Sequence, residues 1–172
     1  MSLKLGDIDL KSENPCINIK STVTRYKNEK NKEKISYKIG ETKTKFSKRS
    51  IPINNELKKL LENYLEEYKN KFKLNDKELK QCFLIPNKNP KEFISPNKLD
   101  YYFRKLKKEC KLDENIHFHS LRHTFVTKCI VDKNIPLSIV KYIVGHSTST
   151  SITIDTYTHI DQNVINKYRN KL

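Results

Sequence analysis

The hydrophobic pattern of this chain changes its period near residue 54, and this change constrains the fold more than any other feature. Before it, short runs typical of strands occur at 16–20, 35–39 and 49–53. After it, apolar residues recur at spacings of three and four, as on one face of a helix. The sequence therefore predicts an α+β fold that is mainly helical, with one small antiparallel sheet at its N-terminal end and long basic connections between the strands.

Helix signals follow one another through the rest of the chain. Asn54 or Asn55 can cap a helix that carries apolar residues from 57 to 68, and Ser95 can cap a second. Further helices are expected from about 118 to 133, from Pro136 to Gly145, from 147–151 onwards and from Asp161 towards the C-terminus. Residues 69–80 are predicted to be a polar linker, and 82–85 a short strand or buried extended segment.

The charge of the chain points to its partner. The 172 residues are enough for one domain, and 35 basic against 20 acidic residues give a net charge of +15. Residues 20–49 alone hold eleven Lys and Arg and three Glu. Such an excess is typical of a protein that binds nucleic acid, and here we expect double-stranded DNA.

Several other classes of protein are excluded by the sequence. No apolar run reaches the ~18–20 residues of a membrane span, and no signal peptide opens the chain, so a cytoplasmic protein is expected. The cysteines form no C-x-x-C pair, which argues against disulfides and structural zinc; they are Cys16, Cys82, Cys110 and Cys129. No clustered carboxylates suggest a Mg²⁺-dependent nuclease, so neither metal nor cofactor is expected.

The motif with most chemical content is His119-Ser-Leu-Arg122-His123-Thr. Residues three apart share a helix face, so His119 and Arg122 are predicted to point the same way. An Arg can hold two phosphate oxygens at once, and a His beside it can move a proton. The pair suits a phosphate-centred site, although two ordinary surface residues would give the same pattern. His123 is predicted to face elsewhere and to be structural.

Two further candidate site residues follow this motif in the chain. His146 follows Gly145, where a helix is expected to end, and Tyr157 lies in Asp-Thr-Tyr-Thr-His. A tyrosine has an ordinary pKa of about 10 and is a weak nucleophile, but it can form a phosphoester where cations surround the phosphate. The order of these features resembles that in the catalytic domain of tyrosine recombinases, the phage integrase family: a basic hairpin, H-x-L-R-H-T, Gly-His and then this tyrosine.

The resemblance covers essentially the whole chain and implies a role for each residue. It implies that Tyr157 attacks phosphorus to form a 3′-phosphotyrosyl link, that Arg122 binds the scissile phosphate, and that His146 hydrogen-bonds a non-bridging oxygen. It implies that His119 assists proton transfer at the tyrosine and that Lys43 protonates the leaving 5′-oxygen. The run Thr-Lys-Thr-Lys at 42–45 leaves Lys45 as the rival of Lys43. The other residues expected to contact DNA are Lys48 and Arg49.

Taken together, the resemblance implies the fold of DNA breaking-rejoining enzymes and site-specific recombination or integration without a metal. The long basic hairpin favours an integrase of a mobile element over a chromosome-dimer resolvase. A synaptic tetramer on DNA is implied for the full-length protein, with accessory DNA-bending or excision factors as further partners, in a bacterial cytoplasm or nucleoid.

One departure from the family pattern qualifies this interpretation. The opening Leu3-Lys-Leu-Gly-Asp-Ile-Asp9 resembles a family stretch that lies just after the first catalytic arginine, so no residue here matches that arginine. We expect residues 1–172 to be a partial catalytic domain, inactive alone, without the preceding helix and the N-terminal core-DNA-binding domain, and with residues 1–2 derived from a vector. The alternative is a catalytically dead relative that binds DNA or regulates a complete recombinase.

Overall fold

The computed structural model of the chain describes residues 2–27, 35–41, 48–145 and 162–172. Its strands form two antiparallel sheets. The first has three strands in the order β1-β2-β5, with bounds β1 (Ile8–Asp9), β2 (Cys16–Ile19) and β5 (Arg49–Pro52). The second is a ribbon of two strands, β3 (Ser21–Lys27) and β4 (Ile35–Glu41).

The three predicted strands are confirmed, but the prediction of a single sheet was wrong. The 21–27 segment, expected to be a basic connection, is a strand that pairs with β4, with Val23 opposite Ile39 and Arg25 opposite Tyr37. Thr22, Val23 and Thr24 are β-branched and favour extended backbone, and this outweighs the charge of the segment.

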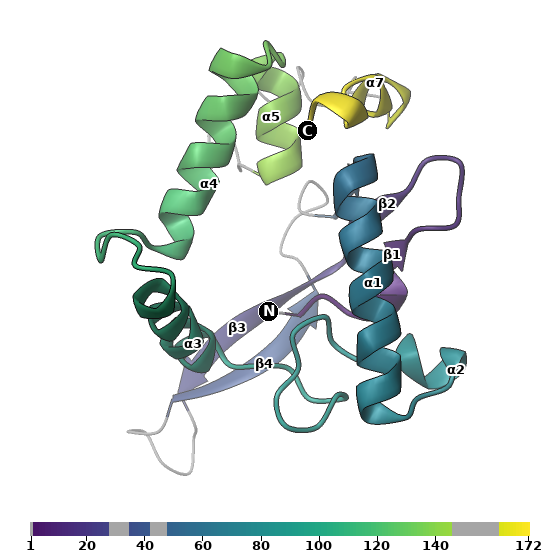
Figure 1. Ribbon diagram of the computed structural model, residues 1–172, viewed down its shortest axis with the longest axis vertical. Helices are drawn as coiled ribbons and strands as arrows, with labels where there is room; N and C mark the ends of the chain where they lie inside the picture. The colour runs from purple at the N-terminus through teal and green to yellow at the C-terminus, as the bar shows by residue number, and fades with distance from the viewer. Residues whose placement is uncertain (1, 28–34, 42–47, 146–161) are drawn as a thin grey trace.

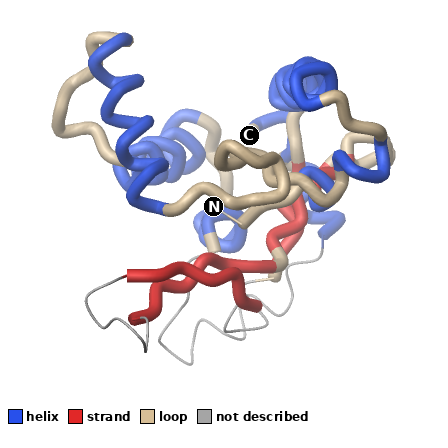
Figure 2. Tube along the Cα trace, turned by 90° about the horizontal axis from the view of Figure 1, so that it is seen from below, coloured by secondary structure: helices blue, strands red, loops and turns tan. Residues whose placement is uncertain are grey.

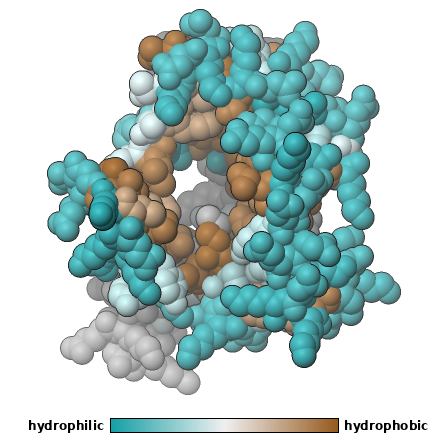
Figure 3. Space-filling model, in the orientation of Figure 1, coloured by the Kyte–Doolittle hydropathy of each residue, from teal (hydrophilic) through white to brown (hydrophobic). Residues whose placement is uncertain are grey.

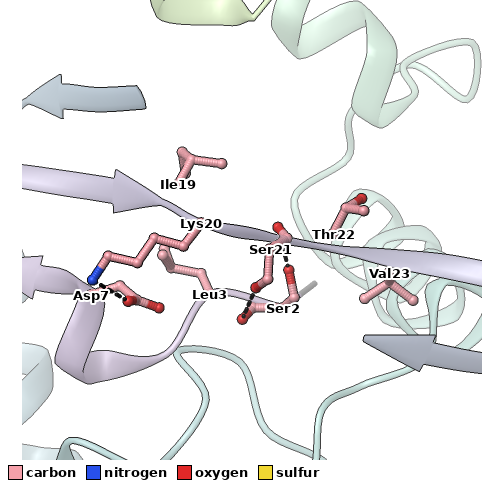
Figure 4. Close-up of a pocket in the computed structure, with 8 residues that line it drawn as sticks. All are labelled: Ser2, Leu3, Asp7, Ile19, Lys20, Ser21, Thr22 and Val23. Carbon is pink, nitrogen blue, oxygen red and sulfur yellow. Dashed lines mark hydrogen bonds and ion pairs between the residues drawn. The ribbon is translucent and has the colours of Figure 1, made fainter. Parts of the chain in front are cut away.

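The N-terminal residues fasten the start of the ribbon, as Figure 4 shows. The hydroxyl of Ser2 donates to the carbonyl of Ser21 at 2.8 Å, and the ammonium of Lys20 lies 3.2 Å from the carboxylate of Asp7. These contacts border an open cavity of about 350 Å³ at the junction of β2 and β3. The cavity is lined by none of the predicted catalytic residues, and the contacts beside it tie the start of β3 to the N-terminal residues.

The helices begin and end largely where their caps predict. They are α1 (Asn55–Phe72), α2 (Asp76–Leu79), α3 (Pro96–Glu109), α4 (Phe118–Thr127), α5 (Leu137–Val144) and α7 (Gln162–Lys167). Asn54 caps α1 by accepting from the N–H of Leu57 at 2.8 Å, and Ser95 caps α3. The short α2 lies in the predicted linker, where Asn75 and Glu78 form a capping box. The predicted helix over 118–133 is confirmed as α4 continued by a π-helical turn, Lys128–Asp132.

Helix α1 lies on one side of the molecule and α3 and α4 lie on the other (Figure 1), with a central hollow between them in the space-filling view (Figure 3). The β3–β4 ribbon lies on one side of the helices (Figure 2). Apolar side chains border the hollow in the space-filling view (Figure 3). Near α5, a cavity of about 250 Å³ separates Leu57 and Leu60 of α1 from Phe125 of α4 and from Ile143.

Two buried clusters hold the described elements together. The first joins α5, the π-helical turn and α7; its buried members are Cys129, Ile135, Ile139, Val140, Ile143 and Ile165. The second packs the N-terminal turn Leu5–Asp7 beneath α1, with Leu5, Tyr68 and Cys82 at its centre. The first cluster matters more for function, because it fixes α5 and α7 relative to β5.

Candidate active site

Helix α4 presents the His119–Arg122 pair as predicted. The backbone N–H of His117 donates to the hydroxyl of Ser120 at 3.2 Å, which stabilises the first turn of the helix. Both predicted side chains line one cavity of about 180 Å³ between α4 and α5, and Arg122 is half-buried while His119 is exposed. A guanidinium and an imidazole one turn apart in a cavity can together bind a phosphate and move a proton.

The expectation that His123 faces away from this pair was wrong. The rings of His119 and His123 meet edge-to-face with centroids 4.6 Å apart, and both residues line the same cavity. Four residues make slightly more than one helical turn, so positions 119 and 123 share a face just as 119 and 122 do. His123 therefore lies beside His119 on the cavity side of α4.

Helix α5 ends at Gly145, as predicted. This residue has φ = 64° in the left-handed region, and its N–H bonds back to the carbonyl of Tyr142 at 3.0 Å. Glycine adopts this conformation without the steric cost of a β-carbon. The left-handed turn ends α5 at this residue.

Arg49, the first residue of β5, lies against this helix end. Its Nε donates to the carbonyl of Ile143 at 3.0 Å, and a β-carbon added to Gly145 would fall 2.5 Å from its Cζ. Burial lowers the pKa of Arg49 below its ordinary value, and the positive charge of Arg122 lowers it further. The carbonyl ends of α5 carry partial negative charge and help to hold this cation.

Helix α7 contacts the same strand. Gln162, the first residue of α7, donates from Nε2 to the carbonyl of Ser50 at 3.5 Å. Ile165 is fully buried in the cluster formed with α5, and Arg169 donates to the carbonyl of Glu13 at 3.1 Å. The predicted helical tail is therefore confirmed over 162–167, and it docks within the same chain.

Of the other predicted site residues, Lys48 and Arg49 lie within the described part of the chain. Lys48 is exposed immediately before β5. Lys43, Lys45, His146 and Tyr157, together with the helix expected from 147–151, lie outside the described residues. Arg49 was expected to contact DNA, and the sequence did not indicate its packing against α5. The sequence did carry one signal, because the chain has only five Arg against 30 Lys. In such a chain an Arg is expected where its planar, forked guanidinium is needed and a lysine would not serve.

Within 2–27, 35–41, 48–145 and 162–172, no group of three His, Cys, Asp or Glu is arranged to hold a metal ion. None of the helices described there is long and apolar enough to cross a membrane.

Comparison with known proteins identifies the class to which this fold and site belong. The sequence profile of the phage integrase family matches residues 1–163, so the chain belongs to the phage integrase family and has a tyrosine recombinase catalytic domain. A tyrosine recombinase of Pseudothermotoga lettingae is 28% identical over 119 residues, which are 65% of this chain and 34% of that protein. Tyrosine recombinase XerC of Bacillus pumilus is 24% identical over 166 residues, which are 96% of this chain and 45% of that protein.

A solved structure confirms the α+β fold class. The chain resembles the Tn1549 transposon integrase in complex with transposon right end DNA, with a TM-score of 0.50 and 21% identity, over 99% of this chain and 52% of that one. The chain spans about a third to a half of the length of the curated relatives described above.

Proposed function

We propose that this chain supplies the strand-cleaving part of a site-specific recombinase that acts on double-stranded DNA by metal-free transesterification. The observation that carries the proposal is that His119 and Arg122 line one cavity beside the end of α5. Family membership makes a phosphodiester the expected occupant of this cavity. The integrase of Tn1549, a transposon protein in complex with transposon end DNA, supports DNA as the partner and a mobile element as the context.

In the proposed reaction, the phenolic oxygen of Tyr157 attacks phosphorus and forms a 3′-phosphotyrosyl bond. The bond from phosphorus to the 5′-oxygen breaks, Lys43 or its rival Lys45 gives that oxygen a proton, and His119 takes the proton of the phenol. Arg122 and His146 bind the non-bridging oxygens, where negative charge gathers in the transition state. The covalent link conserves the free energy of the phosphodiester, so rejoining needs no ATP and no further cofactor.

The proposed DNA contacts come from the basic residues before and at β5. Lys45 and Lys48 would neutralise backbone phosphates, which positions the duplex but reads little sequence. Choice of target site would then rest on parts of the full-length protein beyond these 172 residues, as would assembly of a synaptic tetramer and recruitment of accessory factors.

The experiment that tests the proposal uses the full-length protein and a nicked suicide DNA site. We expect a covalent protein–DNA adduct that survives denaturing gel electrophoresis and is lost in Tyr157→Phe. Binding to the same DNA with no adduct from the wild-type protein would refute the proposal in favour of a catalytically dead DNA-binding relative.

A further inference from the structure

Two consecutive residues of β5 hold both ends of one segment of the chain. Arg49 donates to the carbonyl of Ile143 and lies against Gly145, which is the last described residue before position 146. The carbonyl of Ser50 accepts from Gln162, which is the first described residue after position 161. Strand β5 therefore contacts both Gly145 and Gln162, the described residues on either side of 146–161.

Arg49 also lies within electrostatic reach of Arg122, since the charge of Arg122 depresses the pKa of Arg49. Two like charges held close together repel, and a nearby anion or a partial negative charge must compensate. For Arg49 the carbonyl of Ile143 supplies part of this compensation. Arg122 itself lines the cavity between α4 and α5, where a bound anion would reduce this repulsion.

We propose that Arg49 is a positioning residue of the cleavage reaction, which holds the end of α5 at Ile143 and Gly145 against β5, beside the cavity that Arg122 lines. The inference rests on the proposed function, and it replaces the direct DNA contact expected for Arg49 from the sequence. It assigns Arg49 to the side of the site that binds the non-bridging oxygens and not to protonation of the leaving group.

The shape of the side chain is as important to this role as its charge. The guanidinium is planar and lies so close to Gly145 that an added β-carbon would fall 2.5 Å from both Cζ and Nη1, while Nε donates to the carbonyl of Ile143. A lysine carries the same charge at the end of a flexible stem and has no donor at the Nε position. Arg49→Lys therefore keeps the charge that attracts DNA but removes the planar guanidinium, so it tests the positioning role separately.

The test measures single-turnover cleavage by the full-length protein on two suicide substrates, one with the natural 5′-oxygen and one with sulfur in its place. A thiolate leaves without a proton, so sulfur restores a variant that lacks only the proton donor. Arg49→Ala and Arg49→Lys are compared with Lys43→Ala, Lys45→Ala and a matched charge control, Lys77→Ala. Lys77 is an exposed residue of α2. DNA affinity and the midpoint of thermal unfolding are measured for every variant.

We expect both Arg49 variants to bind DNA as the wild type does and to cleave about 10²-fold more slowly, because small misplacements of catalytic groups have effects of this size. The loss of cleavage rate should be equal on both substrates. Of Lys43→Ala and Lys45→Ala, the variant that lacks the proton donor should regain its cleavage rate on the sulfur substrate. Lys77→Ala should match the wild type.

Three results would overturn the inference: wild-type cleavage by Arg49→Lys, recovery of the Arg49 variants on the sulfur substrate, or a loss of rate that only follows a loss of DNA binding or of folded protein. If Arg49→Ala fails to fold, Arg49→Lys, which keeps the stem and the charge, decides. A wild-type protein that forms no adduct would instead refute the proposed function itself.

Discussion

The guanidinium of Arg49 occupies the space that a side chain on Gly145 would need, since an added β-carbon would fall 2.5 Å from Cζ. The two residues come from β5 and from the end of α5, 96 positions apart in the sequence. Glycine is therefore required at position 145 for two independent reasons, its left-handed backbone and the arginine against it.

Gly145→Ala should destabilise the chain and slow cleavage. The left-handed conformation costs a residue with a β-carbon roughly 1–2 kcal/mol, and displacement of Arg49 adds to this. Thermal or urea unfolding measures the loss. Gly40→Ala is the matched control, because its β-carbon would meet only Thr24 Oγ1 at 4.0 Å. Equal stability of Gly145→Ala and Gly40→Ala would contradict the close packing of Arg49.

Ile165→Ala should destabilise the chain by about 2–5 kcal/mol, because truncation of a buried side chain leaves a cavity. Ile165 is fully buried against α5, whereas its neighbour Val164 is 38% exposed. Val164→Ala is therefore the control and should change the free energy of unfolding much less. If the two variants unfold at the same urea concentration, α7 does not dock on its own chain in solution.

The thiols should differ in their rates of reaction with a disulfide reagent at pH 8. Cys110 is exposed and should react first. Burial raises the pKa of the Cys82 and Cys129 thiols, so at pH 8 a smaller fraction is thiolate, and both should react only when the chain opens. Cys16 is half-buried and should fall between them. Mass spectrometry of labelled peptides gives the order, and fast labelling of Cys129 in the native protein would contradict the packing of the first cluster.

Local signals in the sequence predicted most of the elements correctly. Asn54, Ser95 and Gly145 act through hydrogen bonds and backbone conformations within a few residues, so their positions are readable from the chain alone. Strand pairing depends on distant partners, and for that reason the pairing of β3 with β4 was missed. Periodicity likewise identifies a helix face without showing what covers it, since Leu60 of α1 is 61% exposed.

The difference between local signals and distant contacts applies to the candidate site as well. His119 and Arg122 are one turn apart, so their common helix face followed from spacing alone, whereas the cavity that they line also needs α5. The contact of Arg49 with Gly145 joins two elements that only the tertiary fold brings together, and no spacing rule could reveal it. His123 was misassigned because adjacency to Arg122 was given more weight than its four-residue spacing from His119.

Binding of this chain to duplex DNA should be weak, nearly independent of sequence and strongly dependent on salt. About 5–6 phosphate contacts imply a slope of about −5 when log K is plotted against log salt concentration. Fluorescence anisotropy with two unrelated duplexes between low and moderate salt measures it. Lys48→Ala should reduce the slope by about one if Lys48 contacts a phosphate. An affinity that does not change with salt would contradict an electrostatic interface.

Tyr157→Phe in the full-length protein should abolish the covalent adduct and leave DNA binding unchanged, because it removes one hydroxyl and no charge. Tyr168→Phe is the matched control; Tyr168 packs against the α5 cluster, and its variant should form adduct at the wild-type rate. Arg122→Ala should keep the nucleophile but lose about 10²–10³ in cleavage rate, since a group that stabilises charge on the phosphate contributes several kcal/mol to the transition state. Suicide substrates and denaturing gels measure all three. Adduct formed by Tyr157→Phe at the wild-type level, through Tyr142 or Tyr168, would refute both the nucleophile and the assignment of the site around Arg122.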